Sequence, residues 1–122
     1  MAAIYAGDAT NKGEDGADYW MINYGKLPGY YITEDELLDL GWQNGKRPAK
    51  YAPDRMLGGG IYRNENEHLP SAPERLWYEA DINYYNGVRN RPRLLYSSDG
   101  LVFVTYDHYE TFYEIEVKNY ES

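Results

Sequence analysis

Four residues of types that act on phosphate esters lie in one stretch of the chain, residues 76–112: Glu79, Arg89, Arg93 and His108. A glutamate can accept a proton as a general base, a histidine can hold and release one near neutral pH, and an arginine can bind two phosphoryl oxygens at once. Taken singly, each type is common in solvated or structural positions. Their occurrence together favours the cleavage of a phosphate ester.

The residues around this set predict three strands joined by short turns. Residues 77–84 alternate so that Glu79 is presented on one face of a strand and Ala80 on the other. Strand-like runs follow at 94–97 and 101–106, and turns are expected at 86–87, 98–100 and 106–109. Such a meander returns the turn that carries His108 to the edge where Glu79 and the arginines lie.

The N-terminal half of the chain predicts helices. The first is expected to begin at Asp15 as N-cap and to end at Gly25, and the second begins at a capping box formed by Thr33 and Glu36. A short helix is expected at 48–51, and the first strand at 61–64 after tight packing at Gly58, Gly59 and Gly60. The residues expected in the core are Trp20, Met21, Leu37, Leu40, Ile61, Ala80, Ile82, Leu94, Tyr96, Val102 and Val104.

These elements predict an α+β fold. Two or three N-terminal helices pack on one face of a twisted antiparallel sheet of about five strands, and the active site lies on the opposite, concave face. The chain has 122 residues, which suits one domain. We expect a flexible N-terminal segment at 1–14 and a single domain at 15–122.

Composition narrows the classes of function. The chain has no cysteine, which excludes disulfides and cysteine-bound zinc. A net charge of -8 argues against a general nucleic-acid binder, although residues 75–93 carry more arginines than acids. We find no apolar run that fits a membrane span and no signal-peptide pattern. We therefore expect no membrane partner, and either a secreted monomer in its mature form or a released toxin domain.

The segments WYEADINY, GVRNRPRLLYSSDG and DHYETF resemble those of the barnase and binase family of microbial guanyl-preferring ribonucleases. The segments KLPGYYIT, LGW, AP, GG and a further LP occur upstream in matching order, so the resemblance covers nearly all of the chain after about Asp15. It implies a barnase-like fold and a metal-independent endonuclease for single-stranded RNA. Such an enzyme makes a 2',3'-cyclic phosphate by attack of the 2'-hydroxyl and then hydrolyses it to a 3'-phosphate.

The resemblance also assigns roles to the chemical residues. It implies that Glu79 is the base, that His108 is the acid, that Arg89 and Arg93 hold the phosphate, and that Tyr109 contacts the nucleobase. No metal or cofactor is implied, because RNA supplies its own nucleophile. The implied partners are RNA and a barstar-like protein inhibitor.

Base selection is where the sequence departs from the family. In relatives the loop that corresponds to Asn64–Leu69 holds guanine through backbone amides and a glutamate. This chain has Glu65 where relatives have a basic residue, Asn66 where they have that glutamate, and Glu67 next. A carboxylate can accept from two guanine N–H groups at once, and an amide cannot. Guanine preference is therefore open, with Glu65 or Glu67 as substitutes after a small shift of the loop.

A second departure lies at the start of the second helix. Relatives carry an active-site lysine where this chain has Glu34, which weakens phosphate binding unless Arg63 reaches the cleft to compensate. The alternative interpretation is a catalytically weakened barnase-fold module that binds a barstar-like inhibitor or another partner. An acidic carbohydrate-binding β domain fits the many tyrosines, but it leaves Glu79, Arg93 and His108 unexplained.

Overall fold

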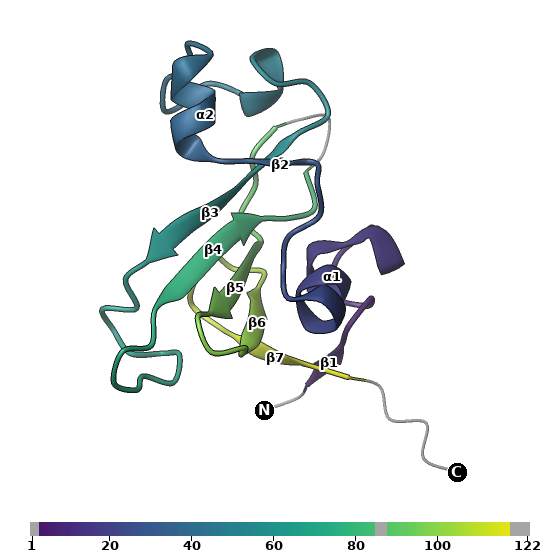
Figure 1. Cartoon of the computed structure of the whole chain (residues 1–122), viewed down its shortest axis with the longest axis vertical. Coiled ribbons are helices and arrows are strands. Elements are labelled where there is room, and N and C mark those ends of the chain that lie inside the picture. The colour runs from purple at the N-terminus through teal and green to yellow at the C-terminus, as the bar shows by residue number, and fades with distance from the viewer. Residues whose placement is uncertain (1–2, 85–87, 118–122) are drawn as a thin grey trace.

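The sheet is the largest element of the computed structural model, which describes residues 3–84 and 88–117. The turn predicted at 86–87 lies outside these residues. Within them, seven strands form one sheet in the order β1-β7-β6-β5-β4-β3-β2 (Figure 1). The strands are β1 (Ile4–Tyr5), β2 (Tyr31–Ile32), β3 (Met56–Tyr62), β4 (Trp77–Asp81), β5 (Arg93–Ser97), β6 (Val102–Thr105) and β7 (Tyr113–Glu116).

The predicted α+β class and the antiparallel meander are confirmed. Strands β3 to β7 pair antiparallel, while β1 and β2 add two residues each at the edges and pair parallel to β7 and β3. Two residues are too few to give a pattern in the sequence, so these edge strands were not predicted. The first strand of the meander is β3 at 56–62 and not 61–64, because Asn64 has a φ of 53° and has left the strand.

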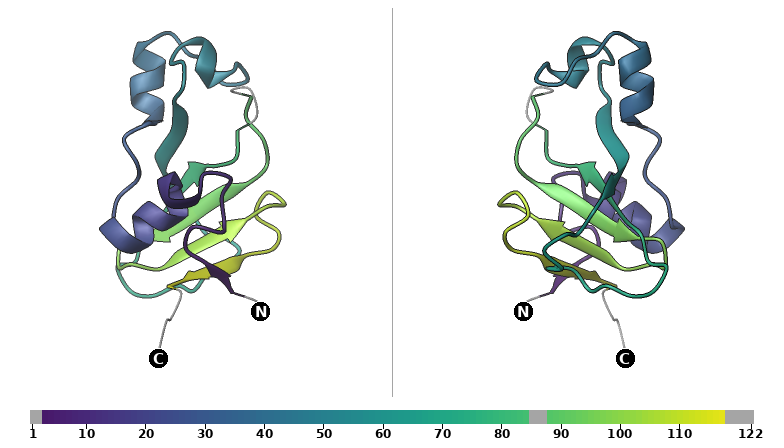
Figure 2. Two further views of the ribbon diagram at one scale, coloured as in Figure 1. Left: turned by 90° about the vertical axis from the view of Figure 1, so that its right-hand side faces the viewer. Right: turned by 90° about the vertical axis from the view of Figure 1, so that its left-hand side faces the viewer.

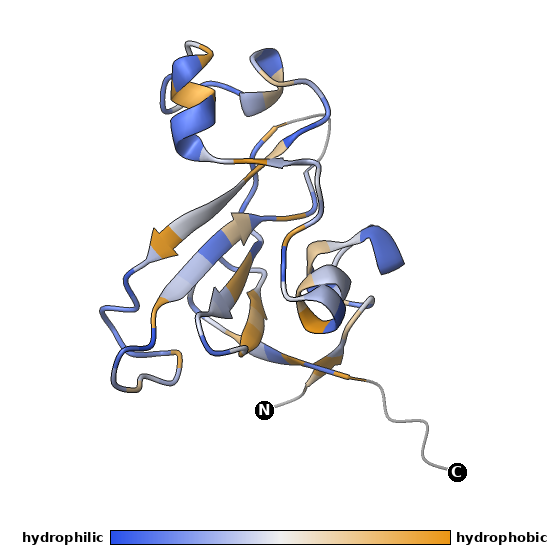
Figure 3. Cartoon of the chain, viewed as in Figure 1, coloured by the Kyte–Doolittle hydropathy of each residue, from blue (hydrophilic) through white to orange (hydrophobic). Residues whose placement is uncertain are grey.

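The helices lie in two places. Helix α1 (Ala17–Tyr24), preceded by the 3-10 turn η1 (Gly13–Asp15), packs beside β5, β6 and β7, whereas α2 (Glu34–Asp39) and η2 (Pro48–Lys50) lie at the far end beside β2 and β3 (Figures 1 and 2). Only α1 therefore covers the face of the central sheet. In Figure 3, α2 is mostly hydrophilic with one hydrophobic band, as expected of a helix that buries a narrow stripe.

Of the three predicted helix-end signals, the capping box and the end of α1 at Gly25 are confirmed, and the N-cap is wrong. Thr33 and Glu36 form the capping box, with Glu36 N donating to Thr33 Oγ1 at 3.2 Å and Thr33 N donating to Glu36 Oε1 at 3.0 Å. The second helix stops at Leu40, directly before Gly41, and Gly25 ends α1 in the left-handed conformation. Asp15 is not the N-cap of α1. Gly16 takes that position, because Asp15 belongs to η1.

The main core lies between α1 and the sheet. It contains Ala80, Ile82, Leu94, Val102 and Val104 as predicted, with Met21 and Tyr96 packed against it. Three core predictions are wrong, since Leu40 is 54% exposed, Ile61 is 64% exposed, and Trp20 is partly buried outside the core clusters. Leu40 caps the end of α2, which reaches its own small core through Leu37. Ile61 lies on β3 beyond the two residues that pair with β2.

The N-terminal segment has defined contacts from residue 3 onward. Strand β1 pairs with β7, and Ala9 lies in the main core. The carboxylate of Asp18 is fully buried and accepts hydrogen bonds from Gly7 N at 2.7 Å and Ala9 N at 3.0 Å. A buried carboxylate with such donors holds the preceding loop in place. This segment was predicted to be flexible. Its contacts with the rest of the domain depend on Asp18, and no local sequence pattern indicates that role.

Glycine is required at Gly58, where the strands come close. A Cβ built there would lie 2.6 Å from the Tyr31 ring and 3.1 Å from the Cβ of Ala80, which leaves no room for a side chain. The tight packing predicted for the three glycines is thus confirmed at Gly58 only, since a Cβ at Gly59 would lie 3.8 Å from Thr33 and one at Gly60 would meet no atom within 4 Å. In the described part of the chain, no helix is long and apolar enough to cross a membrane.

Candidate active site

The register of β4 and β5 brings the predicted residues to the sheet face away from α1. Glu79 lies opposite Leu95, and Asp81 lies opposite Arg93. Residues directly opposite each other in antiparallel strands point to the same face, so these four side chains share one side. Ala80, between the two acids, points into the main core. The alternation predicted from the sequence therefore places Glu79 correctly.

One buried carboxylate holds both predicted phosphate-binding arginines. Arg89 Nε donates to Asp81 Oδ2 at 2.6 Å and its Nη2 donates to Oδ1 at 3.1 Å, while Arg93 Nε lies 3.0 Å from Oδ1. Tyr84 donates its hydroxyl hydrogen to the same carboxylate, which is 3% exposed as a residue. Burial alone lowers the pKa of Arg89, but its hydrogen bonds with Asp81 raise that pKa above its ordinary value. Both guanidinium groups are thus fixed before any substrate binds.

Each arginine keeps a donor for a ligand. Arg93 is 4% exposed, and its Nη1 donates to the backbone oxygens of Asn90 at 2.6 Å and Pro92 at 2.7 Å. Within the described residues, Nη1 of Arg89 and Nη2 of Arg93 make no hydrogen bond. With two cations against one anion, this end of the site is positively charged in an acidic protein and suits a phosphate.

Tyr109 connects Glu79 to an aromatic pair. Its hydroxyl donates to Glu79 Oε1, and its ring stacks on Tyr62 with centroids 5.1 Å apart and planes inclined by 16°. Burial raises the pKa of Tyr109, and the hydrogen bond to Glu79 raises it further. Burial also raises the pKa of Tyr62. Both phenols therefore stay neutral, and the hydroxyl of Tyr109 acts as a hydrogen-bond donor to Glu79.

His108 lies in an exposed turn held by the residue before it. The carboxylate of Asp107 accepts from the backbone amides of residues 110 and 111 at 3.1 and 2.8 Å and from Thr105 Oγ1 at 2.9 Å. These hydrogen bonds, with that of residue 111 the largest cause, lower the pKa of Asp107 to about 2. The imidazole ring packs edge to face on Tyr109 with centroids 4.6 Å apart, and Tyr109 in turn donates to Glu79, whereas His108 itself lines neither of the two cavities described next.

A cavity of about 250 Å³ opens over the acidic and basic residues. Glu79, Asp81 and Arg89 line it, together with Glu34 from the first turn of α2. The structure thus brings Glu34 to the cleft where relatives carry lysine, as the sequence predicts. Arg63 is exposed and does not line this cavity.

An adjoining cavity of about 260 Å³ shares Asn44 and Arg89 with the first. It is lined by Arg93 and by Lys46 and Arg47 of the loop after α2, and no acid lines it. That loop is fixed because the indole N–H of Trp42 donates to Lys46 O at 2.9 Å. The two basic loop residues were not singled out from the sequence, since only the fold brings them beside the arginines.

The loop after β3 is closed by Asn64. Its Nδ2 donates to Leu69 O at 2.9 Å, and Leu69 N donates to its Oδ1 at 3.1 Å, so the side chain of Asn64 positions the loop. Glu65, Asn66 and Glu67 are exposed, and Asn66 Oδ1 accepts from the amide of residue 68 at 3.2 Å. The loop lies at the Trp77 end of β4, the opposite end from Asp81. No three metal-ligating side chains gather anywhere in residues 3–84 and 88–117.

Comparisons with known proteins show which family this chain belongs to. The ribonuclease family model matches residues 15–116. A ribonuclease of Heyndrickxia coagulans is 47% identical over 102 residues, which are 83% of this chain and 94% of that protein. Ribonucleases of Bacillus intermedius and Bacillus pumilus are also 47% identical over 102 residues, and this chain spans 63% of their length.

Among solved structures, ribonuclease Sa2 with guanosine-2'-cyclophosphate matches at 23% identity with a TM-score of 0.46. The match covers 73% of this chain and 97% of that one. The family match and the site together define this chain as a protein of the ribonuclease class. It belongs to the family of microbial guanyl-preferring ribonucleases that includes barnase and binase.

Proposed function

We propose that the chain is an endonuclease that cleaves single-stranded RNA by attack of the 2'-hydroxyl on the adjacent phosphorus, with no metal in the reaction. The observation that carries the proposal is the pair of arginines held by Asp81: Arg89 lines the cavity of Glu79, and Arg93 lines the adjoining cavity that also contains Arg89. The substrate supplies the nucleophile and its geometry, so the protein has to supply only a base, an acid and fixed positive charge.

In the first step, Glu79 accepts the proton of the 2'-hydroxyl while the 2'-oxygen bonds to phosphorus. Arg89 and Arg93 stabilise the negative charge that develops on the phosphoryl oxygens. The bond to the 5'-oxygen then breaks, and that oxygen takes a proton from His108. The product is a 2',3'-cyclic phosphate. In the second step water attacks the cyclic phosphate with the two roles exchanged, and a 3'-phosphate results.

The nucleobase of the attacked nucleoside lies, in this proposal, between the loop after β3 and the Tyr62–Tyr109 pair. Asn66 offers one carbonyl acceptor where a glutamate offers two, so we propose weaker selection of guanine than in the relatives. Glu65 and Glu67 are exposed and close enough in sequence to take the missing contact. Because Asn64 is fully engaged in closing the loop, its contribution is to position these residues.

The second candidate function is a binding module with little catalysis. It is favoured by Glu34, whose negative charge in the cleft repels a phosphate. It is also favoured by the hydroxyl of Tyr109, which already donates a hydrogen bond to Glu79 Oε1. A barstar-like inhibitor is one partner proposed for either function. Lys46 and Arg47 favour the enzyme, because they add positive charge to the adjoining cavity.

The test is cleavage of fluorogenic RNA dinucleotides with EDTA present. We expect Glu79→Gln and His108→Ala each to lower kcat/KM by about 100-fold or more, the usual scale for loss of a general base or acid. Glu114→Gln, an exposed strand glutamate on β7, is the matched control and should cleave like the wild type. Wild-type cleavage no faster than that of the two variants, with all proteins folded, would favour the binding module.

A further inference from the structure

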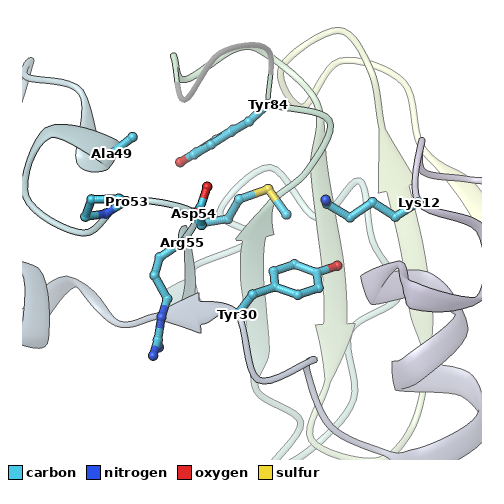
Figure 4. Close-up of a pocket in the computed structure, with 8 residues that line it drawn as sticks. Lys12, Tyr30, Ala49, Pro53, Asp54, Arg55 and Tyr84 are labelled. Atoms are coloured by element: carbon cyan, nitrogen blue, oxygen red, sulfur yellow. The ribbon is translucent and has the colours of Figure 1, made fainter.

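A larger cavity, of about 450 Å³, is separate from Glu79 and is built from segments far apart in the sequence (Figure 4). Its lining includes Lys12 from the N-terminal segment, Tyr30 from the loop before β2, Asp54 and Met56 at the start of β3, and Tyr84 after β4. Lys12 lies outside residues 15–116, the part that matches the family model. The complete cavity therefore depends on a segment beyond the family match.

The two tyrosines are rigid walls. Tyr30 donates its hydroxyl to Asp15 O at 2.6 Å and stacks on Tyr31 with centroids 5.1 Å apart, and burial raises its pKa to about 12. The hydroxyl of Tyr84 donates to Asp81. Both hydroxyls are bound to other residues, so a ligand in the cavity would contact the two aromatic rings. These rings are neutral and held in place. Fixed aromatic surfaces of this kind favour a flat, aromatic ligand.

Two opposite charges, those of Lys12 and Asp54, belong to residues that line the same cavity. The Lys12 ammonium lies 5.1 Å from the centroid of the Tyr30 ring. Among the described residues, neither this ammonium nor the Asp54 carboxylate makes a hydrogen bond or an ion pair. Figure 4 shows them on different sides of the cavity, whereas the guanidinium of Arg55 points away and donates to Tyr31 O at 3.3 Å. A ligand for this cavity needs an anionic group, a hydrogen-bond donor and a flat ring.

We propose that the cavity binds a nucleotide whose base carries an exocyclic amino group. The phosphate pairs with Lys12, the base lies against Tyr30 and Tyr84, and its amino group donates to the Asp54 carboxylate. The volume is within the range of small-molecule sites. Cytosine, adenine and guanine have the amino donor, and uracil has a carbonyl in its place. A bound nucleotide would touch the Tyr84 ring, whose hydroxyl donates to the carboxylate that holds both arginines.

The test is a titration with 5'-CMP, 5'-UMP or cytidine. Binding is measured by NMR from the shifts of the backbone amide resonances of residues 29–30 and 53–55. These amides report this cavity and not the Glu79 cleft. We expect 5'-CMP to shift these resonances. 5'-UMP should bind about tenfold more weakly, because uracil has no amino group to donate to the Asp54 carboxylate. Lys12→Gln should weaken the binding of 5'-CMP about three- to fivefold and leave the binding of cytidine unchanged, because cytidine has no phosphate.

Asp54→Asn tests the base contact with little change to the fold. Asp54 has a φ of 63°, which asparagine tolerates. An amide can donate to uracil O4 as well as accept from cytosine, so this variant should bind 5'-CMP and 5'-UMP about equally. The controls are Lys26→Gln and Asp39→Asn, which remove the same charges from residues that line neither cavity. Unmoved amides with 5'-CMP, or equal binding of the two nucleotides by the wild type, would overturn the proposal.

Cleavage assays then identify the source of the nucleotide. If the cavity takes free nucleotides, 5'-CMP changes the rate at which the wild type cleaves a dinucleotide and has no such effect on Lys12→Gln. If it takes a distal nucleotide of the substrate, Lys12→Gln lowers kcat/KM for a hexanucleotide and not for a dinucleotide, while Lys26→Gln lowers neither. Binding is measured without cleavage, so failure here leaves the proposed ribonuclease function intact.

Discussion

Asp81 and Arg93 lie directly opposite each other on β4 and β5, and their buried side chains form an ion pair in which Nε is 3.0 Å from Oδ1. The same carboxylate binds Arg89 and Tyr84, so one residue orients the whole cationic side of the site. Removal of one partner from a buried ion pair leaves the other charge without compensation. Asp81 is therefore a positioning residue that both stability and activity depend on.

We expect Asp81→Asn to lower the free energy of unfolding by about 3 kcal/mol, the scale measured for breaking a buried pair. The amide keeps the shape and one acceptor but not the charge. Urea unfolding gives the stability, and kcat/KM for a dinucleotide should fall while KM rises, because the arginines lose their fixed orientation. Asp39→Asn removes a carboxylate from the surface of α2 and is the control. Unchanged stability in Asp81→Asn would contradict the role of the ion pair.

The ring and the hydroxyl of Tyr109 have separate roles that two variants distinguish. Tyr109→Phe keeps the stack on Tyr62 and removes the donor to Glu79, whereas Tyr109→Ala removes both. We expect the first to change KM less than about twofold, because the ring and its stack on Tyr62 are kept. The second should raise KM about tenfold, the scale of one lost base stack. Equal KM values for both variants would exclude the ring from substrate binding.

Asp107 makes the stability of the His108 turn depend on pH. Its pKa in the folded protein is about 2, against an ordinary value of 3.8, because the backbone amide of residue 111 and further donors bind the ionised form. A carboxylate with a lowered pKa stabilises the folded state above its unfolded pKa, and this contribution is lost as pH falls from about 4 to about 2.

Thermal unfolding between these pH values tests the role of Asp107. Asp107→Asn should have a lower Tm than the wild type at neutral pH, and the difference should shrink as the pH falls to about 2. Glu110→Gln removes a neighbouring exposed carboxylate and is the matched control. A Tm difference that stays constant over this range would show that the charge of Asp107 does not stabilise the turn.

The sequence predicted the parts of the site that follow from alternation, and it could not predict those that depend on packing. Alternation placed Glu79 on the open face, and the capping box placed Glu34 at the start of α2. Asp81 lies on the same face as Glu79, yet its hold on two arginines follows from the register of β5, which local patterns do not give. Lys46 and Arg47 reach the cleft only because Trp42 anchors their loop.

The misplaced core residues have a related cause. Leu40 and Ile61 are hydrophobic and lie in or beside regular elements, so composition suggests burial. The structure exposes both, because α2 serves a separate small core and β3 lies near the edge of the sheet. Trp77, Leu95 and Phe103 form a cluster on the site face instead. The predicted core list contains none of these three residues.

Glu34 offers the sharpest test of whether the charge of one cleft residue limits the reaction. It lines the same cavity as Glu79 and Arg89, so its charge opposes a phosphate there. We expect Glu34→Lys to raise kcat/KM by about 10 to 1000-fold, the scale of one electrostatic contact to the transition state. Glu34→Gln, which removes the repulsion without adding a cation, should give a smaller rise. Asp39→Lys makes the same change of charge on α2 away from the cavity, and an equal gain from it would mean that overall charge, and not the cleft, limits the reaction.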